Sequence, residues 1–401
     1  MPTFQQLPFS IPFSVNKLAS TTGNNKTQLR SPLEAAAQGD LTRLQQLWDQ
    51  DFDFDLQSTP DGLRPLHYAA SRGHLSIVKF LIDCCHVTVD IVDHEGETAL
   101  LKAAYAGHFS VVEYLIIHAG ANVLHEDKDG WSALHNACSY GDLDMVIFLI
   151  DHFLNVNLQS KMDHTPLTSK GHLRIVQHLV YKANADLFIK NKFGETAYDA
   201  AAVAGEVYIC EQLEKAERER IQDGYDLLRQ HYTIPVILYE NQQSVISLMT
   251  NSYIPSTWEK HQRIPWMLAS SSSFLGDDDN NNQYMTKNQV RLPPLTDQQV
   301  WMWLTDWKID YTHPNVDMDG WQYATHLDTP DENWSNKLPK SSTRRISYVR
   351  RRRWVRIMTR QRSSDIHDNN INDSDIETNH HPTTTTIIDL DATDDNSNAQ
   401  E

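Results

Sequence analysis

The sequence predicts a multidomain chain: an all-α solenoid of helical repeats, followed by an all-β domain, with disordered segments at both termini. Three observations indicate this fold class. A glycine recurs at a nearly constant interval through the first half of the 401 residues. After about residue 233, helical periodicity gives way to strings rich in β-branched and aromatic residues. Residues 363–401 hold ten acidic residues and no basic one, with few aromatics, a composition typical of disorder.

The glycine period predicts a stack of paired helices. The glycines lie 34, 34, 34, 30 and 34 residues apart, and a leucine follows each one after eight residues: Gly39, Gly73, Gly107, Gly141, Gly171 and Gly205. Glycine readily adopts the left-handed conformation that closes a helix, so each is expected to end a short first helix. The Val/Leu stripe that follows then marks a second helix. One such unit cannot bury both of its helices alone, so stacked neighbours supply the core.

Three segments carry a resemblance to the ankyrin-repeat family: RPLHYAASRGHLSIVKFLI (64–82), TALLKAAYAGHFSVVEYLI (98–116) and SALHNACSYGDLDMVIFLI (132–150). We expect about six repeats over residues 31–220. The fifth, TPLTSKGHLRIVQHL (165–179), lacks three residues of its first helix and is expected to be shortened, with a local irregularity or bend. Residues 1–30 are expected to be disordered, and residues 221–235 to form a helical cap or linker.

The resemblance implies a protein-binding surface on the turn tips and the concave face of the first helices. Its candidate residues are Arg72, Tyr105, Trp131 and Tyr140. Trp131 follows a turn glycine and either anchors a partner or packs against a neighbouring turn. Several histidines match turn and helix-start positions of the ankyrin pattern, and no two of them share a ligand spacing on one face: His67, His74, His108, His135 and His172. No metal site is therefore predicted.

The second half combines tryptophan and arginine in strand-like strings. Alternation along VWMWL places Trp301 and Trp303 on one face of a strand. In RRISYVRRRRWVRI (344–357), Arg350, Arg352 and Trp354 share one face, while Arg351 and Arg353 share the other. A guanidinium stacked on an indole contributes about 0.5 to 2 kcal/mol, so we predict structural Arg/Trp stacks. Their candidate members are Trp301, Trp303, Trp307, Trp321, Arg350, Arg351, Arg352, Arg353 and Trp354.

This half is similar to the dysferlin-type domain of ferlins, fungal peroxins and tectonin-repeat proteins. The resemblance spans residues 236–358 and rests on VILYENQ (236–242), RIPW (263–266), RLPP (291–294), the W-x-W-x-x-x-W at 301–307, DMDGWQYA (317–324), Trp334 and VRRRRWVR (349–356). It departs from the family at Gln243, where an arginine is usual, and in a low-complexity insertion at 270–283. The resemblance implies an all-β domain in proteins of peroxisomal and other intracellular membranes.

Charge is distributed unevenly along the chain. The net charge of −18 argues against general nucleic-acid binding, but residues 340–362 hold ten Lys/Arg and no acidic residue. The run Arg350–Arg353 is interpreted first as a structural strand. The alternatives are nuclear import and attraction to an anionic membrane, worth about 1 kcal/mol per basic residue near the surface. Further arginines are expected outside the stacks: Arg344, Arg345, Arg356, Arg360 and Arg362. The acidic tail 363–401 either screens this basic stretch or is simply solvated.

Catalytic motifs are missing from the sequence: it contains no P-loop, GxGxxG, HExxH, GxSxG or zinc signature. No enzyme activity or cofactor is therefore predicted. Four cysteines without a CxxC pair indicate a reduced, intracellular protein, and neither a secretory leader nor a membrane-spanning helix is expected. The sequence predicts a cytoplasmic, non-enzymatic adaptor. It binds a protein partner through its repeats and acts at the surface of a peroxisomal or endoplasmic-reticulum membrane through its β domain. The alternative is a soluble regulatory scaffold with no membrane role.

Overall fold

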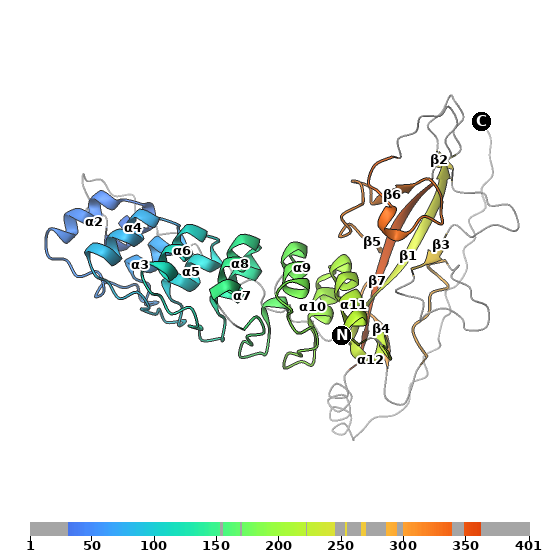
Figure 1. The fold of residues 1–401 in the computed structure, drawn as a ribbon, viewed down its shortest axis with the longest axis horizontal. Coiled ribbons are helices and arrows are strands. Elements are labelled where there is room, and N and C mark those ends of the chain that lie inside the picture. The colour runs from blue at the N-terminus through green and yellow to red at the C-terminus, as the bar shows by residue number, and fades with distance from the viewer. Residues whose placement is uncertain are drawn as a thin grey trace, which may run out of the picture. The chain divides into compact units, whose positions relative to one another are not determined.

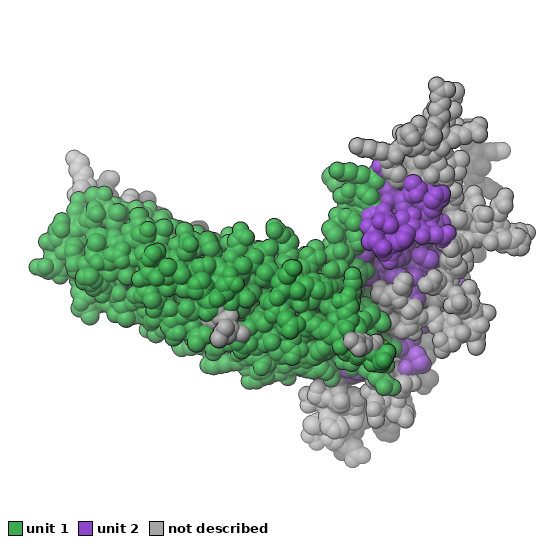
Figure 2. Space-filling view, viewed as in Figure 1, with its two compact units in different colours: residues 1–235, 310–322, 335–337 green, residues 236–309, 323–334, 338–401 purple. Residues whose placement is uncertain are grey.

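A computed structural model describes the residues on which the following account rests. The described residues are 31–152, 155–168, 171–221, 223–244, 253–254, 266–269, 286–294, 300–338 and 349–361. The predicted disordered segments 1–30 and 363–401 and the predicted insertion 270–283 lie outside them. The chain divides into two compact units, coloured separately in Figure 2. The helical unit comprises 1–235, 310–322 and 335–337, and the β unit comprises 236–309, 323–334 and 338–401.

Paired helices follow one another along the helical unit (Figure 1). First helices pack against the first helices of neighbouring pairs, as α3 does on α1 and α5. The helices are α1 (Pro32–Gln38), α2 (Leu41–Trp48), α3 (Pro65–Ser71), α4 (Leu75–Lys79), the π-helical η1 (Phe80–Cys84), α5 (Ala99–Tyr105), α6 (Phe109–Ile117), α7 (Ala133–Tyr140), α8 (Leu143–His152), α9 (Leu173–Tyr181), α10 (Ala197–Ala204), α11 (Val207–Ile221) and α12 (Leu227–Gln230).

Local chemistry explains where the first helices begin and end. At α1 the hydroxyl of Ser31 accepts a hydrogen bond from the Glu34 backbone N–H, which satisfies one of the free donors of the first turn. Gly39 then closes the helix with φ +80°. Gly141 and Gly205 close α7 and α10 in the same left-handed conformation.

The fifth repeat differs from the others. Its first helix is reduced to a single 3-10 turn, η2 (Pro166–Thr168). Gly171 does not share the positive φ of the other period glycines. The three missing residues leave too little chain for an α-helix that a left-handed glycine could end.

Turns between the repeats are joined to one another by backbone hydrogen bonds. The N–H of Lys128 donates to the carbonyl of Glu95 in the preceding turn at 2.9 Å, and the N–H of Lys161 donates to the carbonyl of Asp129 at 2.8 Å. Each repeat therefore fixes the turn of its neighbour as well as its helices, as expected of a solenoid whose stability depends on contacts between adjacent units.

The second half forms a sheet of seven strands among the described residues. The main order is β2-β1-β7-β4, β3 also pairs with β1, and β5 and β6 also pair with β7. The pairings of β1 with β2 and β3, and of β7 with β4 and β5, are antiparallel. The strands are β1 (Thr233–Ser244), β2 (Tyr253–Ile254), β3 (Trp266–Leu268), β4 (Trp301–Trp303), β5 (Lys308–Ile309), β6 (Trp321–Ala324) and β7 (Val349–Arg360), with the 3-10 turn η4 (Asp331–Asn333).

Strand β7 is the centre of this sheet. Its exposure alternates, so Val349, Arg351 and Arg353 are buried while Arg350 and Arg352 are half-buried, as the two-residue period of a strand requires. Opposite β7, Trp301 of β4 faces Arg360 and Trp303 faces Met358. The strand therefore presents one row of arginines to the interior and another to a partly open face.

The predicted fold class is confirmed: a helical solenoid precedes an antiparallel β region. Two short segments of the expected β domain, 310–322 and 335–337, group with the helical unit instead. Within that unit the Thr312 hydroxyl accepts a hydrogen bond from the Tyr208 N–H at 3.0 Å. Of the helices in the described ranges, none combines the length and the apolar character needed to cross a membrane.

Candidate functional site

Three predicted binding residues form a row along the repeats, which we call the helix-end row. Arg72 caps the C-terminus of α3, Tyr105 is the last residue of α5, and Tyr140 is the last residue of α7. Because α3, α5 and α7 pack side by side (Figure 1), the three side chains lie at corresponding ends of successive helices. Arg72 is exposed, and the exposed fractions of Tyr105 and Tyr140 are 45% and 52%.

The Tyr140 ring covers a glycine of the preceding repeat, a contact that a histidine ring makes elsewhere in the stack. The ring of His108 lies on Gly73, and the ring of Tyr140 lies on Gly107 so closely that a Cβ there would be 2.1 Å from it. The His108 ring also lies 3.1 Å from the carbonyl of Ser71. The histidine directly follows the glycine of its own repeat, but in the fourth repeat Asp142 stands there. Tyr140 of that repeat supplies the ring contact instead. About half of the Tyr140 side chain stays exposed (52%), so Tyr140 both packs on Gly107 and contributes to the surface.

Trp131 lies at the other end of α7 from Tyr140. It precedes the N-cap residue Ser132, and an eight-residue helix is about 12 Å long. The Trp131 indole is half-buried, with its ring centroid 5.4 Å from that of His135 in the same repeat. The backbone N–H of Trp131 donates to Asp127 Oδ1 at 2.8 Å. The structure thus brings together three of the four predicted residues and places Trp131 apart from them, at a turn tip.

The repeat histidines form hydrogen bonds with backbone carbonyls of neighbouring segments. His67 Nε2 lies 2.9 Å from the Ile91 carbonyl, and His135 Nε2 lies 3.1 Å from the His164 carbonyl. Burial lowers the pKa of both imidazoles to about 4, so both are neutral at pH 7. Within the described ranges, no three His, Cys, Asp or Glu side chains gather as metal ligands would.

Lys102 is a buried cation that the sequence analysis missed. Its side chain is 4% exposed, and Nζ lies 2.8 Å from Asp93 Oδ2 and also contacts Glu97. Burial opposes its charge, but the two carboxylates outweigh burial and raise the pKa of Lys102. The signal was present in the sequence: KAA at 102–104 carries a lysine among small residues of a buried first helix.

A second buried charged cluster joins α10, α11 and the segment after α12 at the C-terminal end of the repeats. His231 Nε2 lies 2.8 Å from Glu217 Oε2, and His231 Nδ1 lies 3.7 Å from Asp199 Oδ2. The Tyr198 ring stacks on the imidazole at 4.0 Å. Burial favours the neutral imidazole, but the hydrogen bonds that it donates to the carboxylates of Asp199 and Glu217 outweigh burial and raise the pKa of His231 to about 9. Asp199 also accepts hydrogen bonds from the N–H of Thr233.

In the β unit, one acid on β1 gathers two members of the predicted stacks. Glu240 Oε2 accepts hydrogen bonds from Nη2 of Arg352 at 2.7 Å and from Nε1 of Trp354 at 2.8 Å. One step along the same face, Arg350 donates through Nε and Nη2 to Gln242 Oε1 at 3.0 and 2.7 Å. Glu240 and Gln242 of β1 therefore contact alternate side chains of β7, namely Arg350, Arg352 and Trp354.

Arg351 lies between two aromatic rings on the buried face. Its Cζ is 4.2 Å from the ring centroids of both Tyr239 and Trp334, and its Nη1 donates to Asp331 Oδ1 at 2.6 Å. Trp334 is 1% exposed and donates through Nε1 to the Thr329 carbonyl. A charge this far from water is favourable only when it is paired and stacked, and this site provides both.

Two arginines expected outside the stacks are part of them. Arg356 Cζ lies 4.3 Å from the Trp303 ring centroid, and Arg360 Cζ lies 5.8 Å from that of Trp301. The expectation was wrong because it ended the stacked run at Trp354, whereas β7 continues to Arg360 opposite β4. The other three arginines of that group lie outside the described residues: Arg344, Arg345 and Arg362.

The remaining predicted stack members lie in different surroundings. The Trp307 ring centroid is 6.4 Å from that of Trp303, and Arg353 is 1% exposed. Trp321 is buried and belongs to the helical unit, where its backbone N–H donates to Asp317 Oδ1 at 2.8 Å. Sequence reasoning missed Tyr239, Glu240 and Asp331 as partners of the arginines.

Comparison with known proteins identifies the repeats. One model of ankyrin repeats, describing three copies, matches residues 33–127, and a second, describing many copies, matches residues 116–168. The chain therefore carries ankyrin repeats over residues 33–168. Both matching models describe repeats, and neither describes an enzyme. The helix-end row lies entirely within this range.

Two curated relatives show partial similarity. The chain is 33% identical over 442 residues to the FYVE zinc finger domain protein UPA1 of Mycosarcoma maydis, a match that covers 77% of this chain and 34% of UPA1. It is 28% identical over 144 residues to the peroxisomal membrane protein PEX30 of Saccharomyces cerevisiae, which covers 34% of this chain and 25% of PEX30. The chain thus spans about a third of the length of one relative and a quarter of the other.

A solved structure is also similar. The match is to a chain of the complex between the Bd0816 predatory endopeptidase of Bdellovibrio bacteriovorus and immunity protein Bd3460. It has a TM-score of 0.42 and 28% identity, and covers 48% of this chain and 99% of that chain.

Proposed function

We propose that this chain is a non-enzymatic adaptor. Its ankyrin repeats hold a protein partner, and its β unit acts at an intracellular membrane of peroxisomal or endoplasmic-reticulum type. The observation that carries the first half is the ankyrin array at residues 33–168, because such stacks present extended surfaces for protein binding. The second half rests on the partial similarity to PEX30, a peroxisomal membrane protein.

The helix-end row supports a protein-binding surface on the repeats. Arg72, Tyr105 and Tyr140 offer a guanidinium and two phenol rings at successive helix ends. Arginine and tyrosine are enriched among the residues that dominate binding energy at protein interfaces. Trp131, half-buried at a turn tip, is proposed as a secondary contact of the same partner.

The dysferlin-type assignment is supported by which residues meet in the β unit. The motifs that carry the resemblance, VILYENQ and VRRRRWVR, lie on β1 and β7, and Glu240 of the first pairs with Arg352 of the second. A motif pair that forms one polar network is stronger support than two separate matches. We propose residues 236–358 as the extent of this domain.

Partner binding is tested by proximity labelling in cells with the full chain. The double variant Tyr105→Ala, Tyr140→Ala should lose the partners that the wild type labels. Tyr181→Ala is the matched control, because Tyr181 is as exposed as Tyr105 (both 45%) but lies on α9, away from the helix-end row. Equal labelling by the double variant and the wild type would overturn the proposed surface.

Membrane association is tested by imaging the tagged full chain beside peroxisomal and endoplasmic-reticulum markers. A second version ends at residue 235, where the N-terminal part of the helical unit ends, and its folding is checked by circular dichroism. Signal at membranes that this version loses would support the adaptor. Diffuse signal from both versions would favour the alternative, a soluble regulatory scaffold whose β unit binds another protein.

A further inference from the structure

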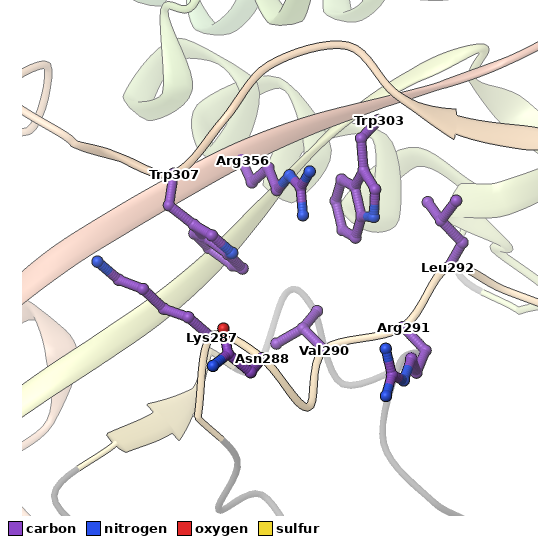
Figure 3. Close-up of a pocket in the computed structure, with 8 residues that line it drawn as sticks. All are labelled: Lys287, Asn288, Val290, Arg291, Leu292, Trp303, Trp307 and Arg356. Atoms are coloured by element: carbon purple, nitrogen blue, oxygen red, sulfur yellow. The ribbon is translucent and has the colours of Figure 1, made fainter. Parts of the chain in front are cut away.

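The β unit contains a pocket of about 460 Å³ whose role the adaptor function leaves unexplained. Figure 3 shows it between the segment 286–294 on one side and the tryptophans of β4 and the following loop on the other. Pockets of 300–1,000 Å³ are typical of small-molecule sites. The lining residues are Lys287, Asn288, Val290, Arg291, Leu292, Trp303, Trp307 and Arg356.

Arg356 places a cation inside this pocket. Its Nε donates to the Thr305 carbonyl at 2.9 Å, and its guanidinium stacks 4.3 Å from the Trp303 ring centroid, which together fix its orientation. In Figure 3 the guanidinium end points into the pocket between the two indoles. The nearest carboxylate, on Asp306, is 3.8 Å from Nη2 and fully exposed, so it neutralises little of the charge.

Trp307 adds a second donor. Its indole Nε1 is shielded from water and has no hydrogen-bond acceptor among the described residues. A buried donor without an acceptor costs about 1 to 3 kcal/mol and is rare enough in folded proteins to require an explanation. Figure 3 shows the nitrogen edge of this ring turned toward the same space as Arg356. An acceptor bound in the pocket would satisfy both groups.

The remaining lining residues indicate the charge and the polarity of a ligand that would fit the pocket. Three of the eight lining side chains are basic and none is acidic, so the lining suits an anion. Lys287 directs its Nζ to the Trp354 ring, 2.8 Å from the centroid, and contributes its methylene stem. Val290, Leu292 and the two indole faces form apolar walls, which suit a hydrocarbon or planar body attached to the anionic group.

We propose that this pocket binds an amphipathic oxyanion: a phosphate monoester or carboxylate held by Arg356 and Trp307 Nε1, with its apolar body between Val290 and the indoles. Arginine suits such a group because its planar fork donates two hydrogen bonds to one oxyanion. The proposal stands independently of the adaptor function, since it concerns binding in solution to the β unit alone.

The first test is calorimetric titration of the full chain with 1-naphthyl phosphate. The comparison ligands are 1-naphthol, which lacks the anion, and inorganic phosphate, which lacks the apolar body. Binding of 1-naphthyl phosphate that exceeds both comparisons supports the proposal. Failure of the wild-type chain to bind it at millimolar concentration, or equally tight binding of 1-naphthol, overturns it.

Two variants then locate the site. Arg356→Gln removes the cation, and Trp307→Phe keeps an aromatic ring but removes the Nε1 donor; each should weaken binding roughly tenfold or more. Arg350→Gln is the matched control, because it makes the same substitution on the same face of β7 but outside the pocket. Equal weakening by all three variants would overturn the assignment. If Arg356→Gln fails to fold by tryptophan fluorescence, the result for Trp307→Phe decides.

The source of the oxyanion is distinguished by vesicles. Phosphatidylcholine vesicles with and without phosphatidic acid, whose headgroup is a phosphate monoester, are floated with the wild type and Trp307→Phe. Flotation that needs the anionic lipid and Trp307 assigns the site to a lipid headgroup. Calorimetric binding without such flotation assigns it to a free phosphate ester or carboxylate. The absence of both contradicts the proposal.

Discussion

Glu240 on β1 and Arg352 on β7 are joined by a double hydrogen bond across the sheet. Nε and Nη2 of Arg352 donate to the same carboxylate oxygen at 3.0 and 2.7 Å. Trp354 Nε1 donates to that oxygen as well, at 2.8 Å. The two charged side chains are only 22% and 15% exposed, so the pair is partly shielded from water and strengthened relative to a surface pair. One carboxylate therefore fastens two neighbouring strands.

Glu240→Gln should destabilise the β unit by about 2 kcal/mol, since it leaves a half-buried guanidinium facing a neutral amide. Urea unfolding followed by tryptophan fluorescence measures the change. Asp306→Asn is the control: its carboxylate also meets an arginine, but at 3.8 Å and fully exposed, so its loss should leave the unfolding free energy nearly unchanged. Equal losses in the two variants would contradict this account.

Arg351→Lys tests whether stacking, rather than charge alone, holds the buried face. Lysine keeps the charge and can still reach Asp331, but it cannot lie flat between Tyr239 and Trp334. We expect a loss of about 1 to 2 kcal/mol in unfolding free energy by the same measurement. Arg291→Lys, on an exposed side chain, should be neutral. An unchanged unfolding free energy in Arg351→Lys would show that stacking of the guanidinium between Tyr239 and Trp334 contributes nothing to stability.

Local chemistry is the part of this structure that the sequence predicts best. The pentapeptide D-x-D-G-W occurs at 127–131 in the repeats and at 317–321 in the second half. In both, the backbone N–H of the tryptophan donates to the side chain of the first aspartate at 2.8 Å, and the glycine adopts φ near +80°, at +77° and +81°. The four shared residues form the same turn in two distant parts of the chain, because turn geometry depends only on near neighbours.

Contacts between distant residues are where sequence reasoning failed. The two-residue period of β7 sorts its arginines onto two faces, but nothing in it indicates that Glu240, more than a hundred residues away, faces Arg352. The pocket depends in the same way on segment 286–294 meeting Trp303 and Arg356. Such pairings follow from strand register and loop path, which a single sequence does not encode as a local pattern.

The helical unit should be most stable near neutral pH. His231 has a folded pKa of about 9, raised by Asp199 and Glu217 above its ordinary value of 6.5. Its contribution is therefore present below pH 6.5 and is lost as the pH rises through about 9. His67 and His135 have pKa values of about 4, so their neutral forms contribute above pH 6.5 and that contribution is lost as the pH falls toward 4.

His231→Gln separates the loss of stability at alkaline pH (the alkaline limb) from the loss at acid pH (the acid limb). The variant should unfold more easily at neutral pH and should lose the further weakening at alkaline pH, worth about 3 kcal/mol for a shift of this size. Its weakening at acid pH should remain, because His67 and His135 are untouched. Urea midpoints from circular dichroism, taken across the pH range, measure both limbs. An unchanged alkaline limb in the variant would rule out the cluster as its cause.

Gly130→Ala should destabilise the helical unit much more than Gly120→Ala. Both glycines have positive φ, +77° and +68°, so alanine pays a similar backbone cost of about 1 kcal/mol at each. At Gly130 the new Cβ would also lie 2.7 Å from the backbone nitrogen of Lys161, whereas Gly120 has nothing within 4 Å. Lys161 is held by its hydrogen bond to Asp129, so relief requires the two turns to separate. We expect a difference of about 2 kcal/mol in urea unfolding by circular dichroism, and equal losses would mean that the turns are not rigidly joined.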